Sequence, residues 1–315
     1  MKLSEIREIS QIFSETAMKV DPGEFQHQLK KMGYAYENFY QELEMDSPYV
    51  NTHVDISHSN ANIQLHSHTF YEILCCHNTC GAEYIIGTER YKLQKGDIIL
   101  VPPDISHRAL LPEVVVEPYI RDVLWINPEF MQQVVRTSSD FLDSILDKPA
   151  FFRTAGSNWG FLCDLFHAGV RESEQRDPGW ESMVIGNTIT ILTHLYRFSK
   201  DIHVRTMQAE KPELIDQVLA YLEAHLEDKI SLPDIAHHFF VSESTITQTF
   251  RKKMGVSFYR CVTQRRLIAA KTLIEKGISL ENVAEQVGFS DYSSFFRAFK
   301  QEYGISPRQY RKMQN

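Results

Sequence analysis

An internal repeat in the last third of the chain constrains the fold more than any other sequence feature. The segment SLPDIA at residues 231–236 returns as SLENVA at residues 279–284. The offset between these two segments is 48 residues, whereas Phe250 returns as Phe299 at an offset of 49. The second copy therefore contains one extra residue. A repeat of this length indicates two consecutive copies of one small structural unit.

Each copy carries the signals of two short helices joined by a tight turn. In the first copy, Ser231 and Ser242 are candidate N-caps, and Gly255 is placed to end the second helix. Ile246 and Phe250 stand four residues apart and predict its buried side. Because so few residues separate the two helices, they must cross steeply, which predicts a helix-turn-helix. A small helical bundle without a DNA partner is the alternative.

Two further helices are expected around the copies. Ahead of the first copy, apolar residues recur at helical spacing from Ile215 to Leu226 and predict a packing helix. Between the copies, residues 258–276 predict one continuous helix with Ala270 and Ile274 on its apolar side. The C-terminal region is therefore predicted to be all-helical, with two helix-turn-helix units.

Charge is unevenly distributed along the chain. The whole sequence has a net charge of −8, yet residues 245–315 contain 13 Lys and Arg against five Asp and Glu, a net charge of +8. The preceding residues therefore carry −16. A basic end on an acidic body is typical of a protein in which one domain meets phosphate. A solvated basic face would give the same pattern, so charge alone decides nothing.

The most specific strings lie in and before the second copy. Residues 284–310 read AEQVGFSDYSSFFRAFKQEYGISPRQY, and the helix between the copies contains the pattern RL-x-x-A-x-x-LI at residues 266–274. With these strings, residues 212–313, about a third of the chain, resemble the DNA-binding domain of the AraC/XylS family of regulators. The family fold implies two recognition helices held by a rigid linker helix, which enter successive major grooves of DNA.

Outward-facing side chains of the two recognition helices are the candidate DNA contacts. We expect base contacts from Ser244, Thr247, Gln248, Ser293, Ser294 and Arg297. Gln suits adenine and Arg suits guanine, each through paired hydrogen bonds, whereas Ser and Thr carry less sequence information. We expect phosphate contacts from Arg251, Lys252, Lys253, Arg265 and Lys300.

The chain length predicts two domains, and the separate strand-rich and helix-rich regions predict an α+β fold class. Residues 1–205 are expected to form a cupin-like domain for effector sensing and dimerisation. Within it, short β-rich runs at about 51–127 predict strands of a β-barrel, and residues from about 128 to 205 predict flanking helices. Residues 206–315 are expected to form the double helix-turn-helix DNA-binding domain. The charged stretch 205–212 is the expected linker.

Two strings in the strand region carry a cluster of polar side chains. HSHTFYE at residues 66–72 has the spacing H-x-H-x-x-x-E, and residues 96–107 read GDIILVPPDISH. Both strings resemble the motifs of a cupin barrel. Strand alternation and this resemblance together gather four side chains, His66, His68, Glu72 and His107. Three imidazoles and a carboxylate suit Zn, Fe or Mn.

Three interpretations of this cluster stay open: polar residues that line an effector pocket, a structural His/Glu cluster, and a divalent metal site. Asp104 stands where metal-binding cupins usually have Gly, which argues against metal enzymology. No cofactor is expected under the first two interpretations. The candidate pocket residues are His66, His68, Glu72, His107, Tyr71, Tyr84, Arg90 and Trp125.

Cysteine usage and hydropathy favour a cytoplasmic protein. No apolar run approaches the length of a membrane span, and charges occupy the N-terminal positions where a signal peptide is apolar. Five cysteines in a chain of 315 residues fit a reducing compartment. Strand alternation predicts that Cys75 and Cys76 face opposite sides of their strand.

These features favour a ligand-responsive, DNA-binding transcription regulator over an enzyme. The family resemblance implies an activator with RNA polymerase as a partner. Residues 159–198, with two apolar helix faces, are expected to supply the contact of a homodimer, although a buried helix inside the domain reads the same way. The alternatives are a metal-dependent cupin enzyme fused to a DNA-binding domain and a ligand-independent architectural protein.

Overall fold

A computed structural model describes the chain in several stretches. These are residues 45–57, 65–78, 81–112, 114–136, 146, 148–201 and 212–314. Most of the expected linker, 205–211, lies outside them. The chain divides into two compact units, and the division in the C-terminal region falls between Arg265 and Arg266. Among described residues the larger unit contains the strands and the first helix-turn-helix, and the smaller unit contains the second.

The described strands of the larger unit form two antiparallel sheets. The strands are β1 (Val50–Ser57), β2 (Tyr71–Cys76), β3 (Glu83–Ile86), β4 (Glu89–Lys92), β5 (Asp97–Val101), β6 (His107–Leu110), β7 (Tyr119–Ile126) and β8 (Ala150–Arg153). One sheet has the order β1-β7-β2-β5-β8, and the other has the order β4-β3-β6. The predicted strand-rich N-terminal region is confirmed. Its assignment as a cupin barrel stays a prediction.

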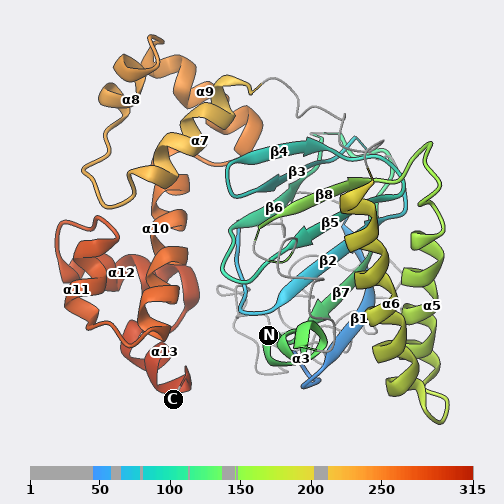
Figure 1. Ribbon diagram of the computed structural model, residues 1–315. Helices are drawn as coiled ribbons and strands as arrows, with labels where there is room; N and C mark the ends of the chain where they lie inside the picture. The colour runs from blue at the N-terminus through green and yellow to red at the C-terminus, as the bar shows by residue number, and fades with distance from the viewer. Residues whose placement is uncertain are drawn as a thin grey trace, which may run out of the picture. The chain divides into compact units, whose positions relative to one another are not determined.

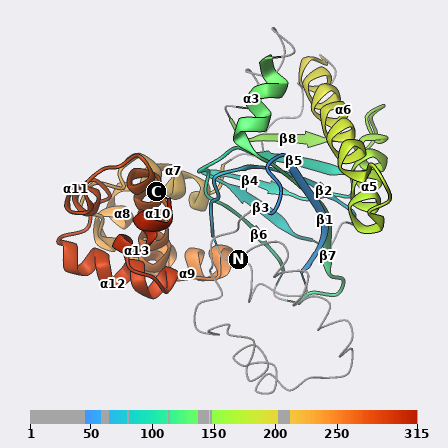
Figure 2. The same ribbon diagram turned by 90° about the horizontal axis from the view of Figure 1, so that it is seen from below.

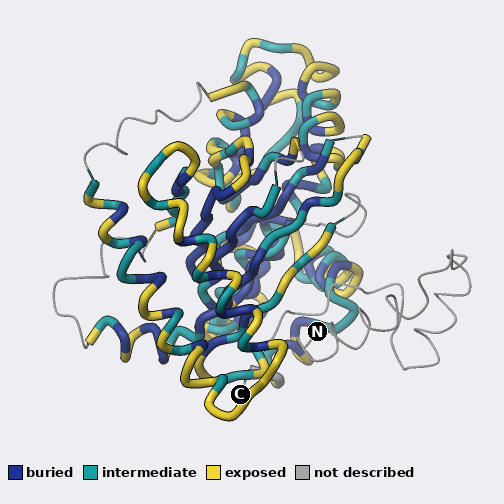
Figure 3. The backbone as a smooth tube through the Cα atoms, turned by 90° about the vertical axis from the view of Figure 1, so that its right-hand side faces the viewer, coloured by how far each residue is buried: buried dark blue, intermediate teal, exposed yellow. Residues whose placement is uncertain are grey.

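Helices cover one face of the five-stranded sheet. α3 (Pro128–Arg136), α5 (Leu162–Gln175) and α6 (Trp180–Lys200) pack against it, and α5 and α6 lie side by side (Figures 1 and 2). Alternate residues of β2, such as Ile73 and Cys75, enter this core. In Figure 3 the strands are largely buried, and within α5 and α6 buried residues alternate with exposed ones along each turn. Glu72 of β2 therefore lies on the opposite face of the five-stranded sheet.

The first helix-turn-helix belongs to the larger unit. It comprises α8 (Leu232–His238) and α9 (Glu243–Met254); α7 (Leu214–Ala224) precedes it and α10 (Phe258–Glu275) follows it. Ile246 and Phe250 are fully buried in its core, as predicted. Ile85 of β3 is packed in the same hydrophobic cluster. The first helix-turn-helix thus shares its core with the three-stranded sheet.

The second helix-turn-helix repeats this arrangement in the smaller unit. It comprises α11 (Leu280–Gln286) and α12 (Tyr292–Tyr303), followed by α13 (Pro307–Gln314). Phe295 and Phe299 are fully buried against the second half of α10. The predicted all-helical C-terminal region with two helix-turn-helix units is confirmed.

The extra residue of the second copy lies at a helix cap. Ser242 caps α9, where its hydroxyl accepts a hydrogen bond from the backbone N–H of Thr245 at 3.1 Å. The equivalent cap of α12 is Asp291, which accepts from the backbone N–H of Ser294 at 2.7 Å. Because Asp291 follows the repeated serine, Ser290, the second recognition helix begins one residue later in its copy. Both helices end, as expected, at a glycine with positive φ.

Candidate functional site

The outer side of α9 carries the first set of expected base contacts. Ile246 and Phe250 fix the orientation of the helix because both are buried in the core. Ser244 and Gln248 are exposed, and Thr247 is half-buried. A polar, solvent-facing side on the second helix of a helix-turn-helix is the surface from which such helices contact base edges.

The outer side of α12 carries the second set. Ser293 and Arg297 are exposed. Ser294 is half-buried, and its hydroxyl donates to the Asp291 carboxylate at 2.8 Å while accepting from Arg297 at 3.5 Å. Ser294 therefore takes part in the helix cap as well as lying on the expected base-contacting side. Arg297 is the side chain on this face with the reach and donors for guanine.

The expected phosphate contacts do not share one environment. Arg251, Lys252 and Lys300 are exposed at the ends of the two recognition helices. Lys253 is less exposed, and its ammonium group lies 3.2 Å from the carboxylate of Glu213. The three exposed side chains can reach a DNA backbone, whereas Lys253 can do so only if its ion pair with Glu213 breaks.

Arg265 requires a correction. Its side chain is only 2% exposed and is among the largest fully buried side chains of the described residues. Its guanidinium forms an ion pair with Glu223 at 2.5 Å and donates to the carbonyl oxygen of Gly87 at 2.8 Å. A guanidinium held in this way has no access to phosphate in this structure, so Arg265 does not contact phosphate as expected.

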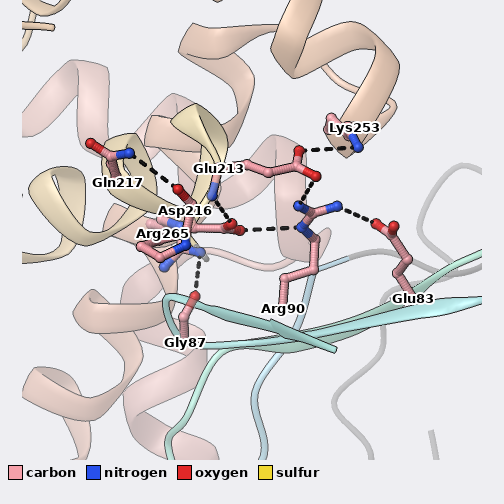
Figure 4. Close-up of polar contacts among 9 residues, drawn as sticks. Glu83, Gly87, Arg90, Glu213, Asp216, Gln217, Lys253 and Arg265 are labelled. Carbon is pink, nitrogen blue, oxygen red and sulfur yellow. Dashed lines mark hydrogen bonds and ion pairs between the residues drawn. The ribbon is translucent and has the colours of Figure 1, made fainter. Parts of the chain in front are cut away.

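Arg90 lies among three carboxylates instead of beside the His/Glu cluster (Figure 4). Its nitrogens lie 2.7 Å from Glu83, 2.8 Å from Glu213 and 3.2 Å from Asp216. Burial of Arg90 opposes its charge, but the bonds to these carboxylates dominate and raise its pKa. Glu213 and Asp216 also form the capping box of α7. Arg90 therefore ties β4 to the first turn of α7.

A third arginine completes this contact between the sheet and the first helix-turn-helix. Arg108 of β6 is 4% exposed, and it donates to the backbone oxygen of Met254, the last residue of α9, at 2.8 Å. Sequence reasoning missed this role, because the partners stand 146 residues apart and no local pattern links them. Arg90, Arg108 and Arg265, together with Ile85, form what we call the arginine interface.

Glu72 is the centre of the buried polar cluster. Its carboxylate accepts from the indole N–H of Trp125 at 2.8 Å and from the hydroxyl of Tyr84 at 3.4 Å. His107 Nε2 lies 3.2 Å from it and His68 Nε2 lies 3.8 Å from it. Because Tyr84 and His107 belong to the three-stranded sheet and Glu72 to the five-stranded sheet, the cluster lies between the two sheets.

The protonation states in this cluster follow from burial and mutual contact. Burial by itself would raise the pKa of Glu72, but contacts with His107 and His68 outweigh it and hold that pKa well below the ordinary value. Burial lowers the pKa of His68. Burial also raises the pKa of Tyr84 well above its usual range, and the charge of Glu72 adds to this effect. The cluster therefore holds an ionised carboxylate beside neutral Tyr84 and, near pH 7, neutral His68.

The imidazoles of the cluster fit either a ligand or a divalent cation. His66 and His107 pair through their backbones, and one ring nitrogen from each of His66, His68 and His107 lies within 4.8 Å of the others. His68 Nε2 and His107 Nε2 are buried without a hydrogen bond of acceptable geometry. These two nitrogens are the available donors or acceptors of the cluster. Tyr71 lies apart, since it packs on the helix-facing core.

Comparison with known proteins places the C-terminal region in a defined class. Residues 235–313 match the family described as a helix-turn-helix domain. The regulatory protein PocR of Salmonella typhimurium is 33% identical over 100 residues, which are 31% of this chain and 33% of PocR. The transcriptional activator RhaR of Escherichia coli is 22% identical over 259 residues, which are 79% of this chain and 86% of RhaR. The chain thus spans only about a third of PocR.

A solved structure of ToxT from Vibrio cholerae is also similar, with 15% identity, a TM-score of 0.36, and coverage of 85% of this chain and 99% of ToxT. The repeated helix-turn-helix with two capped, polar recognition helices defines a DNA-binding module. Residues 235–313 therefore form a helix-turn-helix domain, and the chain is similar to transcription regulators. No helix in the described stretches is long and apolar enough to cross a membrane.

Proposed function

We propose that this protein is a sequence-specific transcription regulator that acts as an activator in the cytoplasm and responds to a small-molecule effector. Its partners are double-stranded DNA, the effector, RNA polymerase and a second copy of the chain. The activator role rests on the resemblance to the AraC/XylS family and on the similarity to RhaR, which is itself an activator. We propose no enzymatic activity, since PocR and RhaR are both regulators.

The observation that carries the proposal is the exposed polar side of each recognition helix. Gln248 on α9 and Arg297 on α12 are both exposed, opposite buried apolar residues. Each supplies paired donors or acceptors for one base, worth about 1–3 kcal/mol of discrimination. Two such helices in one chain support recognition of a site with two boxes.

The arginine interface supports a response to an effector. An effector that changes the spacing of the two sheets would change the positions of Arg90 and Arg108, which hold α7 and α9. Such a ligand shifts the population of DNA-competent states only by its difference in affinity for them. We place the effector against the His/Glu cluster, where His68 and His107 each have a buried nitrogen without a hydrogen bond.

The proposed dimer uses α5 and α6. Most apolar side chains of these helices pack in the core of their own unit, but Met183 and Ile189 of α6 are 60% and 40% exposed. Contiguous exposed apolar patches mark contacts between proteins, so we propose that these two side chains belong to the contact between copies.

Selection from a randomised DNA pool at fixed salt tests the proposal. Purified protein is incubated with the pool, and the bound fraction is sequenced. We expect an enriched site with two short boxes, and Arg297→Ala should relax one of them. Salt-sensitive binding without an enriched sequence would contradict a sequence-specific regulator.

A second experiment separates sensing from enzymatic function. His66→Ala and His68→Ala should abolish effector-dependent reporter expression while DNA binding of the purified protein persists. A metal-dependent cupin enzyme would instead hold metal on His66, His68, Glu72 and His107, and the same variants would lose metal together with turnover of a small substrate.

A further inference from the structure

A second cluster of metal-ligand side chains lies on the helix-facing side of the five-stranded sheet. His77 follows β2, Asp122 lies within β7, and His167 lies on α5. The ligand atoms of these three side chains all lie within 4.8 Å of one another. They come from three elements far apart in the sequence. The fold therefore brings these three residues together, since they are not neighbours in the sequence.

Asp122 is the buried centre of the cluster. It is 0% exposed, and its two carboxylate oxygens lie 2.8 Å from His77 Nε2 and 2.5 Å from His167 Nδ1. Neither oxygen receives a hydrogen bond of acceptable geometry, and the same holds for His77 Nε2. Three buried polar atoms thus meet at ion-pair distances but without hydrogen-bond geometry. A buried carboxylate in this state is costly unless a further group compensates it.

The edge of the cluster reaches solvent. The side chain of His167 is 45% exposed, and that of His77 is 23% exposed. An ion could therefore enter from the α5 side without unfolding the sheet. On the inner side, Cys75 pairs with Asp122 across β2 and β7, and its thiol lies 3.2 Å from that of Cys163. Both cysteines are free.

The donor set is that of a transition metal. Two imidazole nitrogens and one carboxylate oxygen are the ligands of many zinc sites that keep a fourth position open. Ligand atoms around one zinc ion lie about 3.3 Å apart, given metal–ligand distances of about 2.0–2.1 Å. The present contacts of 2.5 and 2.8 Å are shorter than that by about 0.5–0.8 Å. A small movement of the half-exposed His167 would accommodate the ion.

We propose that His77, Asp122 and His167 form a divalent transition-metal site, with Zn²⁺ as the natural occupant, which joins α5 to strands β2 and β7. The site is separate from the His66, His68 and His107 cluster, because it lies on the opposite face of the five-stranded sheet. It does not depend on DNA binding or on the effector. Its role is to fasten α5 to the sheet, since a metal that binds only the folded state stabilises it.

Zinc titration of the full-length protein against a chromophoric chelator, in a non-thiol reductant, tests the proposal. We expect the wild type to withdraw zinc from the chelator, and His167→Ala and His77→Ala each to withdraw one equivalent less. His167→Ala is the primary variant, since a half-exposed side chain can be removed without loss of the fold. Zinc should also raise the thermal unfolding midpoint of the wild type by several degrees more than that of His167→Ala.

Two control variants locate the site. His237→Ala removes an exposed histidine of α8 outside both clusters and should leave every zinc equivalent in place. His66→Ala should leave the equivalent that His167→Ala removes. If the wild type withdraws no zinc, if His167→Ala binds as much as the wild type, or if zinc is lost only in His66→Ala, the proposed site is wrong.

Discussion

The guanidinium of Arg265 donates a hydrogen bond to the carbonyl oxygen of Gly87, which stands 178 residues earlier in the chain. Gly87 lies in the tight turn between β3 and β4, where its φ of 55° suits glycine. Arg265 is buried on α10 and also pairs with Glu223 near the end of α7. One side chain therefore connects a β-turn of the sheet with two helices of the DNA-binding region.

Arg265→Met should destabilise the protein by about 2–3 kcal/mol. The methionine keeps much of the apolar contact but leaves the oxygens of Gly87 and Glu223 without the charged donor, and bonds to charged groups are worth about 1.5–3 kcal/mol. Urea unfolding measures the effect. Arg251→Met is the matched control, because Arg251 is exposed, and should change stability by no more than about 0.5 kcal/mol. Equal effects of the two substitutions would refute the internal role of Arg265.

Arg90→Ala should raise the pKa of Glu213. The hydrogen bond from Arg90 is the largest cause of the lowered pKa of this carboxyl, and Lys253 contributes less. A carboxyl with a lowered folded pKa adds stability above its ordinary value of 4.5, and this contribution is lost as pH falls through the folded pKa. NMR titration of the Glu213 side chain measures the change. Lys253→Ala, the control, should give a smaller shift, and the reverse order would contradict the contact geometry.

Acidification should weaken the larger unit in two stages. His68 has a lowered folded pKa, so stability declines once the pH falls below its ordinary value of 6.5, where the unfolded chain takes up the proton first. Glu72 also has a lowered folded pKa, so a further decline begins below its ordinary value of 4.5. Chemical unfolding between pH 8 and pH 4 measures both stages, and Glu72→Gln should remove the second. A wild-type stability that rises between pH 7 and pH 5 would rule this prediction out.

Arg297→Ala and Lys300→Ala should differ in their effects on DNA binding. Arg297 faces outward on α12 and is expected at a base, so its loss should cost about 1–3 kcal/mol at the selected site and relax one box. Lys300 is expected at a phosphate, so its loss should weaken binding to all sequences. The slope of log binding constant against log salt concentration should then fall in magnitude by about 1. Binding titrations at several salt concentrations distinguish the two effects. Identical effects on selected and random DNA would contradict base recognition by Arg297.

Gly288→Ala should destabilise the second helix-turn-helix by about 1–2 kcal/mol. Gly288 has a φ of 80° in the turn between α11 and α12, and an L-residue with a side chain is strained there. The equivalent residue of the first copy, Phe240, bears this strain with a φ of 55° and is 93% exposed. Phe240→Gly should therefore act in the opposite direction, by up to about 1 kcal/mol, because relief of strain exceeds the entropy cost of glycine. Thermal unfolding tests both predictions: the unfolding midpoint should fall in Gly288→Ala and rise in Phe240→Gly.

The sequence predicted the local features of the DNA-binding region well. Ser231, Ser242 and Gly255 lie at the caps expected of them, because capping depends on residues within one turn of the helix. The cap at Asp291 was not predicted, since a repeat offset by one residue does not say where the extra residue lies. Cys75 and Cys76 contact Cys163 and Tyr119 respectively, as strand alternation required.

Contacts between distant segments were beyond sequence reasoning. Arg265 and Arg297 are both arginines on helices with polar neighbours, and no local pattern shows that one is buried and the other exposed. Arg90 was a candidate for the effector pocket, but its partners lie in the first turn of α7, 123 to 126 residues away, and on β3. The pairing of Glu72 with Trp125 depends on the register of β2 against β7, which the turn signals do not fix.

The two recognition helices present different chemistry, with Thr247 and Gln248 on α9 and Ser293 and Arg297 on α12. A regulator built from two identical readers related by a two-fold axis fits its site equally well in both orientations. A chain with two different recognition helices in tandem fits its site in one orientation only, because reversal of the DNA would bring each box to the wrong helix. Such a protein gives its binding site a direction. Under the proposed function, each bound chain therefore has one orientation on its DNA site.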